Sequence, residues 1–358
     1  MRLLLFLLAC TDEKSADTAA DPTGPDGFTF AVDAPGPFGV GYRALPLDYS
    51  LPDGTTRSVV VNLWYPTEDT EGADAVYTTG TADPLAFASA SLAPPAWSGS
   101  HPVVLHSHGH RGWGANSADL ARFFASQGWI FVAPDHSGNT LMDNLDPRPL
   151  AMYAWRPLDL RAALDAVEAD AALGPTALTG SVLLSGHSYG GFTVWPAGGA
   201  PYDRPTIEAR CAAGELDACD DASLDLLEGP LGEDRAVALM PMAGTIDEAW
   251  VRWADRPLIE APVLFLSGTE DDVGQQAQWD QISGVDYRWV DLLGGCHQTF
   301  GLGTCATLPA EEGFKAVNTY AISWARFAVL GDDDPVVVGI LDGSVSVMDG
   351  STLLHKGP

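Results

Sequence analysis

The stretch GSVLLSGHSYGG, residues 180–191, decides the fold that this sequence predicts. An apolar run typical of a buried strand leads into GHSYG at 186–190, which matches the pattern G-x-S-x-G. In that pattern a serine, here Ser188, occupies a strand-to-helix turn so sharp that its close neighbours must be glycines. A phosphate-binding turn is the alternative, but its G-x-G-x-x-G pattern follows the first strand of a domain, whereas this turn lies mid-chain. The stretch therefore predicts an exposed, nucleophilic Ser188 above an α/β sheet.

The segments on both sides of this stretch alternate between apolar and amphipathic runs. FGVGYRALPLDY and RSVVVNLWYP, joined by the turn signal LPDGTT, predict an antiparallel hairpin at 38–66. Nearly continuous apolar strands separated by helices indicate a mostly parallel sheet covered on both faces. We expect one α/β domain at 28–331 and leave the structure of the tail, 332–358, open. Further strands are predicted at 101–109, 129–134, 180–186, 235–242, 261–268 and 286–295, and helices at 117–128, 156–173 and 311–330.

The composition is that of a globular protein with an acidic surface. The 358 residues are enough for a sizeable core, and 46% of them are hydrophobic. The formal net charge is −30, and Lys14, Lys315 and Lys356 are the only lysines in the sequence. Such a surface repels phosphate backbones, which argues against nucleic acid as a partner.

The first ten residues, MRLLLFLLAC, are typical of a targeting segment. Their apolar run is too short to span a bilayer, and it ends in LLAC at 7–10, which resembles a bacterial lipobox. We therefore expect residues 1–9 to be a lipoprotein-type signal peptide and Cys10 to carry a lipid anchor that tethers an exported protein to the membrane of the cell envelope. An ordinary signal peptide is the alternative. The polar, acidic segment 10–27 is expected to be a disordered linker.

The other four cysteines form two couples that are close in sequence. An even number of cysteines in an oxidising compartment favours disulfides, so we expect the bonds Cys211–Cys219 and Cys296–Cys305. The second bond would close a short, glycine-rich loop next to His297. A zinc site of all four thiolates is the alternative, but its usual C-x2-C spacing is absent.

A serine hydroxyl is a poor nucleophile by itself, so it needs a base and an acid that orients the base. His297 follows the last predicted strand, and three consecutive carboxylates, Glu270, Asp271 and Asp272, follow the strand before it. Ser…Asp…His is the chain order of α/β-hydrolases, in which these groups follow the C-terminal ends of strands. We therefore expect His297 to be the general base of Ser188.

The spacing after the strand selects one of the three carboxylates. Asp271 stands three residues after Gly268, in the frequent pattern G-x-x-D. We expect Asp271 to be the acid and keep Asp272 as the alternative acid. The remaining carboxylates are expected to face solvent.

Acyl transfer also requires hydrogen-bond donors for the oxyanion that develops on the substrate. The backbone N–H of Tyr189, the residue after the nucleophile, is one expected donor. The second is expected from the loop after the strand PVVLHSHG, where the N–H of His110 is favoured and that of Arg111 is the alternative. His106, His108 and His110 occupy alternate positions at the end of a predicted strand, an arrangement that could suggest a metal site. No carboxylate partner for them is evident, so we expect neither a metal nor a cofactor.

With these residues placed, the chain resembles the α/β-hydrolases of the platelet-activating-factor acetylhydrolase-like group, often labelled predicted dienelactone hydrolases. Successive blocks carry the resemblance: GPFGVGYRALPL, RSVVVNLWYPT, PVVLHSHGHRG, ASQGWIFVAPDHSGNT, RPLDLRAALDAV, SGHSYGG and GGCHQTF. The resemblance implies an α/β-hydrolase fold with Ser188 as nucleophile, Asp271 as acid, His297 as base, and Tyr189 and His110 as oxyanion donors.

The sequence departs from that group at two positions. The position of His110 is commonly apolar in the group, and no proline follows the acid here. Dienelactone chemistry itself usually uses a cysteine, whereas the nucleophile expected here is Ser188.

Together these features predict a serine esterase that cleaves lipid, acyl or polyester-like carboxylic esters through an acyl-enzyme. An amidase or peptidase with the same catalytic residues and a non-catalytic binding lipoprotein on the same fold are the alternatives. Tyr153, Trp155, Trp113 and Trp195 are candidates for lining an apolar acyl site, although aromatic residues near helices more often belong to the core.

Overall fold

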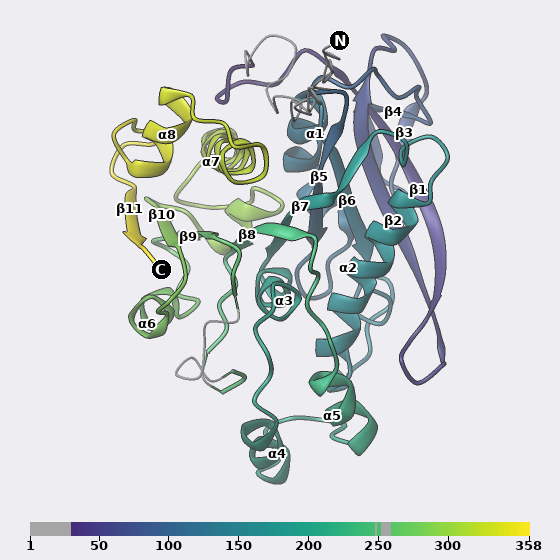
Figure 1. Ribbon diagram of the computed structural model, residues 1–358, viewed down its shortest axis with the longest axis vertical. Helices are drawn as coiled ribbons and strands as arrows, with labels where there is room; N and C mark the ends of the chain where they lie inside the picture. Colours follow the sequence, from purple (N-terminus) through teal and green to yellow (C-terminus); the bar gives the residue numbers. More distant parts are fainter. Residues whose placement is uncertain (1–29, 248, 252–258) are drawn as a thin grey trace, which may run out of the picture.

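A mixed sheet of eleven strands runs through the part of the chain that the structure, a computed structural model, describes: residues 30–247, 249–251 and 259–358 (Figure 1). The expected signal peptide, 1–9, and linker, 10–27, lie outside these residues. The strands are β1 (Gly39–Ser50), β2 (Thr56–Thr67), β3 (Asp74–Val76), β4 (Ala82–Ala88), β5 (His101–Ser107), β6 (Ile130–Asp135), β7 (Ala177–His187), β8 (Ala236–Met242), β9 (Val263–Gly268), β10 (Tyr287–Leu292) and β11 (Thr352–Lys356). The α-helices are α1 (Ala118–Ser126), α2 (Met152–Glu168), α3 (Tyr189–Ala197), α4 (Arg204–Ala212), α5 (Asp221–Glu228), α6 (Gln275–Gln281), α7 (Ala310–Leu330) and α8 (Pro335–Asp342).

The centre of the sheet is parallel, which confirms the predicted fold class. The strand order is β11-β10-β9-β8-β7-β5-β6-β2-β1-β4-β3, and the pairs from β10 to β6 are all parallel. Ser188 follows β7, Asp271 follows β9 and His297 follows β10. Because parallel strands end at the same edge, three segments that are far apart in sequence meet there.

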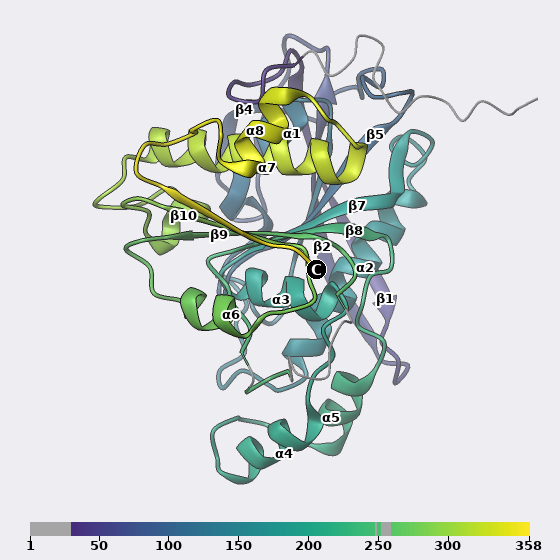
Figure 2. The same cartoon turned by 60° about the vertical axis from the view of Figure 1, so that its left-hand side comes forward.

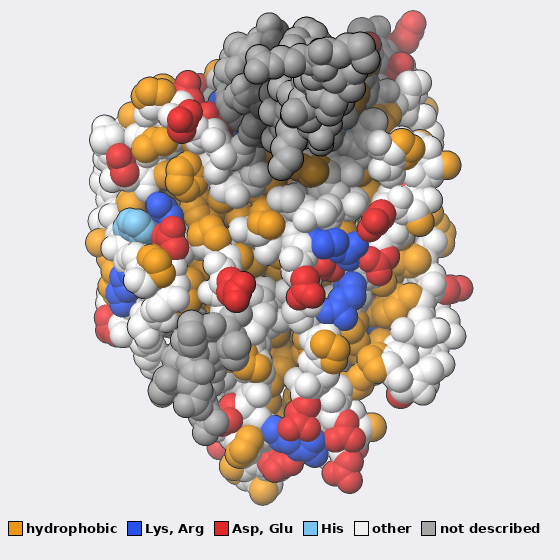
Figure 3. Space-filling model, in the orientation of Figure 1, with side chains coloured by type: hydrophobic (Ala, Val, Ile, Leu, Met, Phe, Trp, Pro, Cys, Tyr) orange, Lys and Arg blue, Asp and Glu red, His pale blue; other side chains and the backbone are white. Residues whose placement is uncertain are grey.

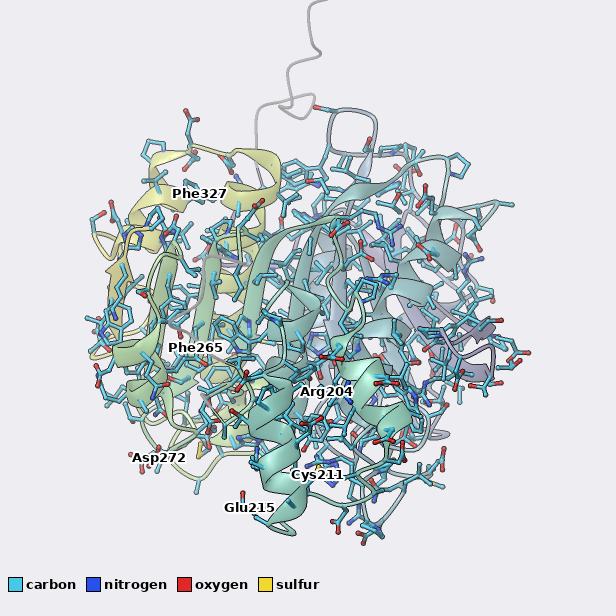
Figure 4. The ribbon with its side chains drawn as sticks, turned by 60° about the horizontal axis from the view of Figure 1, so that its bottom comes forward. Arg204, Cys211, Glu215, Phe265, Asp272 and Phe327 are labelled. Carbon is cyan, nitrogen blue, oxygen red and sulfur yellow. A yellow bond between two sulfur atoms is a disulfide. The ribbon has the colours of Figure 1, made fainter. Side chains whose placement is uncertain are left out.

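The helices form a layer on each face of the sheet (Figure 2). Helices α1, α7 and α8 cover one face, and α2, α3 and α6 cover the other, with α4 and α5 farther out. Side chains alternate between the two faces along each strand. On β9, Phe265 packs into the core on the α2–α3 side (Figure 4), whereas Leu264 and Leu266 belong to the core on the α7 side. Both faces are therefore apolar, as near-continuous apolar strands predicted.

The predicted hairpin is present and has a regular register. β1 and β2 pair antiparallel from Gly39 opposite Thr67 to Ser50 opposite Thr56. At the tip, Gly54 has a φ of 84°, in the left-handed region that favours glycine. The turn signal in the sequence therefore sets the register of the longest pair in the sheet.

Helix α2 begins at Met152, four residues before the predicted start, so Pro157 lies inside the helix. A proline inside a helix cannot donate to the carbonyl four residues earlier. That carbonyl belongs to Tyr153, and it accepts a hydrogen bond of 3.1 Å from the hydroxyl of Tyr202 instead. A contact with a distant segment thus replaces the missing helix bond.

The tail that the sequence analysis left open is folded onto the domain. Helix α8 packs against α7, and β11 pairs antiparallel with β10, from Thr352 opposite Asp291 to Lys356 opposite Tyr287. The tail therefore forms the edge of the sheet next to the strand that precedes His297.

Candidate active site

Ser188 lies in the turn between β7 and α3 with φ 59° and ψ −120°, a strained backbone conformation for a residue other than glycine. The flanking glycines permit close backbone contacts. A Cβ at Gly186 would lie 2.3 Å from the carbonyl oxygen of Gly190, and one at Gly190 would lie 1.8 Å from that of Ser107. Neither position accepts a side chain, which explains the G-x-S-x-G pattern in this turn.

Ser188, His297 and Asp271 form a continuous chain of hydrogen bonds. The Oγ of Ser188 lies 2.7 Å from Nε2 of His297, and Nδ1 of His297 lies 2.8 Å from Oδ2 of Asp271. A carboxylate only accepts, so Nδ1 carries the proton and Nε2 accepts from the serine hydroxyl. The imidazole is in the tautomer that can remove a proton from Ser188.

The structure distinguishes between the candidate acids by geometry. Asp271 is largely buried, with 12% of its side chain exposed, and it contacts His297. Asp272 is exposed at the periphery of the molecule, and its Oδ1 accepts from the N–H of Gly274 (Figure 4). Glu270 is exposed as well. The close approach of the two loops requires Gly268, because a Cβ there would lie 2.2 Å from the carbonyl oxygen of Gly295.

His187, the residue before Ser188, is hydrogen-bonded to the backbone of His297. Its Nε2 lies 2.8 Å from the carbonyl oxygen of His297, and because a carbonyl only accepts, Nε2–H is the donor. Burial, and then the nearby imidazole of His297, lower the pKa of His187 to about 4, so this side chain is neutral. His187 occupies a variable position of the motif, so the sequence alone gives no signal for its role.

The loop after β5 comes close to Ser188, as the expected oxyanion hole requires. A Cβ at Gly109 would lie 3.2 Å from the Cβ of Ser188. Within the described residues, the backbone N–H groups of His110 and Tyr189 have no protein acceptor. Arg111, the alternative donor, has a φ of 55° and follows directly. The structure therefore places two unengaged N–H groups near Ser188.

A buried arginine on α2 holds this loop. The guanidinium of Arg156 donates to the carbonyl of His108, to the Oγ of Ser107 at 2.9 Å, to Thr193 and to Asn139. Its side chain is fully buried, and burial lowers its pKa to about 9, still high enough for a charged group at neutral pH. Removing a side chain that accepts a hydrogen bond from Arg156 would leave its buried charge without that partner, which lowers the stability of the fold.

A second Ser–His–Asp chain continues this network but is wholly buried. Ser107 Oγ lies 2.9 Å from Nε2 of His136, whose Nδ1 lies 2.9 Å from Oδ2 of Asp159. Arg57 pairs with the same carboxylate at 2.7 Å. Because Ser107, His136 and Asp159 are all inaccessible to solvent, this chain serves to position the loop rather than to attack a substrate.

The three alternating histidines at the end of β5 and in the loop after it do not converge. His106 bonds Ser185 at 2.9 Å, His108 accepts from the N–H of His136, and His110 is exposed and bonds Asn139. Over the described ranges, no group of three or more histidine, cysteine and acidic side chains is arranged to hold a metal ion.

Both predicted cysteine couples lie at disulfide-bond distance, with S–S separations of 2.03 Å for Cys211–Cys219 and 2.08 Å for Cys296–Cys305. The second bond encloses His297 and the short 3-10 helix that it begins, His297–Phe300. The first joins the end of α4 to the residue before the N-cap of α5 (Figure 4).

Only some of the aromatic candidates lie near Ser188. The ring of Tyr153 is 5.3 Å from that of Tyr189 and 4.2 Å from that of Trp250, which the sequence analysis did not identify. Trp195 is fully buried in the core, and Trp155 stacks against Arg57. Trp113 packs against the core on the opposite face of the sheet.

No family model and no curated protein matches this chain. Among solved structures, it is similar to a ferulic acid esterase from Streptomyces cinnamoneus. The TM-score is 0.63, the sequence identity is 20%, and the match covers 90% of this chain and 98% of that chain. At this identity the likeness concerns the fold alone. Together with the parallel sheet and its helix layers, it shows that the chain has the α/β-hydrolase fold.

Proposed function

We propose that this protein is a serine hydrolase that cleaves carboxylic esters through an acyl-enzyme on Ser188. The hydrogen-bond chain from Ser188 through His297 to Asp271 carries the proposal. The fold-level neighbour, by its name an esterase for ferulic acid, supports ester chemistry. Membership of the platelet-activating-factor acetylhydrolase-like group remains part of the proposal and is supported by the sequence blocks.

In this mechanism Ser188 attacks the ester carbonyl while Nε2 of His297 takes its proton. The N–H groups of Tyr189 and His110 receive the oxyanion. The protonated His297 then donates to the leaving alcohol, and a water molecule, deprotonated by the same imidazole, hydrolyses the acyl-enzyme. Asp271 holds the imidazole in its tautomer throughout.

A fluorophosphonate probe and a chain-length series of 4-nitrophenyl esters test the proposal. We expect one label per chain, no label on Ser188→Ala, and a loss of about four orders of magnitude in kcat for Asp271→Asn, because the wrong tautomer is then held. Asp272→Asn is the matched control and should lose little. Persistent labelling of Ser188→Ala, or a larger loss for Asp272→Asn, contradicts the assignment. Matched 4-nitroanilides separate an esterase from an amidase.

The disulfides are typical of a protein that folds in an oxidising compartment. Among the described helices, none is both long and apolar enough to cross a membrane. We further propose that Cys10 is lipidated and anchors the protein in the bacterial cell envelope, on the basis of the sequence LLAC. Cells that make the full chain are separated into membrane and soluble fractions. The wild-type protein should be found in the membrane fraction, whereas Cys10→Ser protein from which the signal peptide has been removed should not. A wild-type protein in the soluble fraction contradicts the anchor.

A further inference from the structure

Most arginines in the described part of this acidic protein are ion-paired. On the face drawn in Figure 3, blue side chains lie mostly among red ones. Within the described residues, Arg111, Arg148, Arg156 and Arg161 have no carboxylate partner. The paired arginines are Arg43, Arg57, Arg122, Arg204, Arg210, Arg235, Arg288 and Arg326. In a protein with a formal net charge of −30, a guanidinium without a carboxylate partner is unusual and calls for an explanation.

Two of the four unpaired arginines are accounted for by the fold. Arg156 is buried and donates to the carbonyl of His108 in the loop after β5. Arg161, farther along α2, donates to the backbone carbonyls of Pro230 and Gly232. Arg111 is exposed and has no hydrogen-bond partner among the described side chains. Arg148 differs from all three, because it is partly buried and fixed in place by aromatic rings.

Arg148 lies on the rings of two tyrosines. Its guanidinium carbon is 4.5 Å from the ring centroid of Tyr189 and 5.0 Å from that of Tyr153. One of its nitrogens donates to the hydroxyl of Tyr153 at 2.8 Å. A guanidinium has five N–H donors, so most of the hydrogen-bonding capacity of this ordered side chain is not used by the protein.

These contacts place the charge beside the candidate oxyanion hole. Tyr189 directly follows Ser188, and its ring packs edge-on against that of His110 at 6.4 Å. Burial lowers the pKa of His110, and among the charges that add to this effect Arg148 contributes most. The positive charge therefore sits next to both residues expected to receive the oxyanion.

The loop that carries Arg148 exposes apolar side chains together with two carboxylates, Asp143 and Asp146. Leu141, Met142 and Leu145 are 48%, 79% and 44% exposed. The backbone of this loop contacts the loop after β5, because the N–H of Leu141 donates a hydrogen bond to the carbonyl of Gly112. The exposed side chains of this loop are therefore apolar and acidic, and the guanidinium of Arg148 is the one cation that the loop carries.

We propose that Arg148 binds an ionised carboxylate at the far end of the substrate, so that the preferred substrates are half-esters of dicarboxylic acids with an apolar spacer. The planar fork of a guanidinium matches a carboxylate, and one guanidinium balances its single charge, whereas a phosphate monoester carries nearly two. The inference rests on the esterase function proposed above and adds the class of substrate. Arg148 is thus a specificity-determining residue.

A pair of substrates of equal shape tests the inference. Monomethyl adipate, ionised at pH 7.5, is compared with methyl 6-amino-6-oxohexanoate, its neutral amide, and kcat/KM is measured by pH-stat titration and chromatography. We expect the wild type to prefer the carboxylate about tenfold, as is typical of a charged hydrogen bond in a partly exposed site. Arg148→Gln should bring the ratio to about one, and Arg148→Lys, which keeps the charge but not the fork, should retain part of it.

Arg161→Gln is the matched control, because it removes one distant guanidinium without a carboxylate partner and should change neither the ratio nor the activity. A ratio near one in the wild type, or an equal loss on both substrates in Arg148→Gln, overturns the inference while the esterase function stands. If the wild type hydrolyses neither substrate nor 4-nitrophenyl butyrate and Ser188 is not labelled, the esterase function and this inference both fail.

Discussion

At the scale of single residues, His187 connects the turn that carries Ser188 to the backbone of His297. It occupies the variable position of the G-x-S-x-G pattern, yet its Nε2–H holds the carbonyl of His297 at 2.8 Å. A displacement of about 1 Å in a catalytic group can cost on the order of a hundredfold in rate. We therefore propose that this hydrogen bond contributes to catalysis by holding His297 in position.

We expect His187→Leu to lower kcat by ten- to a hundredfold while KM changes little, because the substrate does not contact this buried side chain. His187→Gln, which can restore an N–H donor, should recover part of the rate. The measurement is steady-state kinetics with 4-nitrophenyl butyrate, with near-UV circular dichroism as a control for the fold. An unchanged kcat in a folded His187→Leu variant argues against the positioning role.

The sequence predicts a role for residues whose place follows from the order of strands along the chain. It gives no signal for residues whose role depends only on tertiary contacts. Ser188, Asp271 and His297 follow three strands in a fixed order, so strand prediction and spacing locate them. His187 and Arg148 have no such signal. Their roles depend on contacts with residues 110 and 41 positions away, which no local pattern encodes.

At the scale of elements, the loop 293–309 that carries His297 is held by a covalent bond. Gly294 and Gly303 in this loop have positive φ angles, so the unfolded segment has much conformational freedom to lose. A bond that closes a loop of this size removes roughly 2–3 kcal/mol of that freedom in the chain-entropy model. Cys296–Cys305 thus favours the conformation in which His297 faces Ser188.

We expect Cys305→Ser to lower kcat more than it raises KM, and to lower the melting temperature by several degrees. The double variant Cys211→Ser/Cys219→Ser is the control: it removes the bond of the distant α4–α5 segment, so it should affect stability but leave kcat nearly unchanged. Kinetics and thermal unfolding of both, with peptide mass mapping of the wild type, provide the test. Free Cys296 and Cys305 thiols in exported protein would refute the role.

Elements with strong apolar patterns could be predicted, and peripheral ones could not. The strands at the centre of the sheet are buried on both faces, so their sequences are unmistakable. The helices α4 and α5 are mostly exposed and contribute only Ile207, Leu224 and Leu227 to the buried core. Arg204 of α4 adds surface ion pairs with Asp225 and Glu228 of α5. Edge strand β11 is only partly buried, so its short pattern is weak until β10 pairs with it.

At the scale of the whole molecule, five histidines are buried in the described part of the chain. Burial lowers the pKa of His101, and it lowers the pKa of the other four, His106, His108, His136 and His187, still further. Burial is the main cause that lowers the pKa of each of these four, to about 3 for His106 and about 4 for His187, and well below the ordinary value for His108 and His136. All four are therefore neutral in the folded protein at neutral pH.

These histidines make the fold sensitive to acid in a defined window. Below about pH 6.5 the unfolded chain protonates them, whereas the folded protein does not until the lowered pKa is reached. The unfolded state then binds more protons, so the free energy of unfolding falls as the pH falls, by about 1.4 kcal/mol per pH unit for each histidine. Four such groups together amount to roughly 5 kcal/mol per unit, comparable to the total stability of many domains.

We therefore expect urea unfolding to give a free energy that drops steeply between pH 6.5 and about pH 5. His106→Asn should make this slope shallower by about one proton, because one group no longer titrates in the unfolded chain. A wild-type free energy that is flat over this window, or a slope that His106→Asn does not change, would show that the buried histidines do not set the acid limit of the fold.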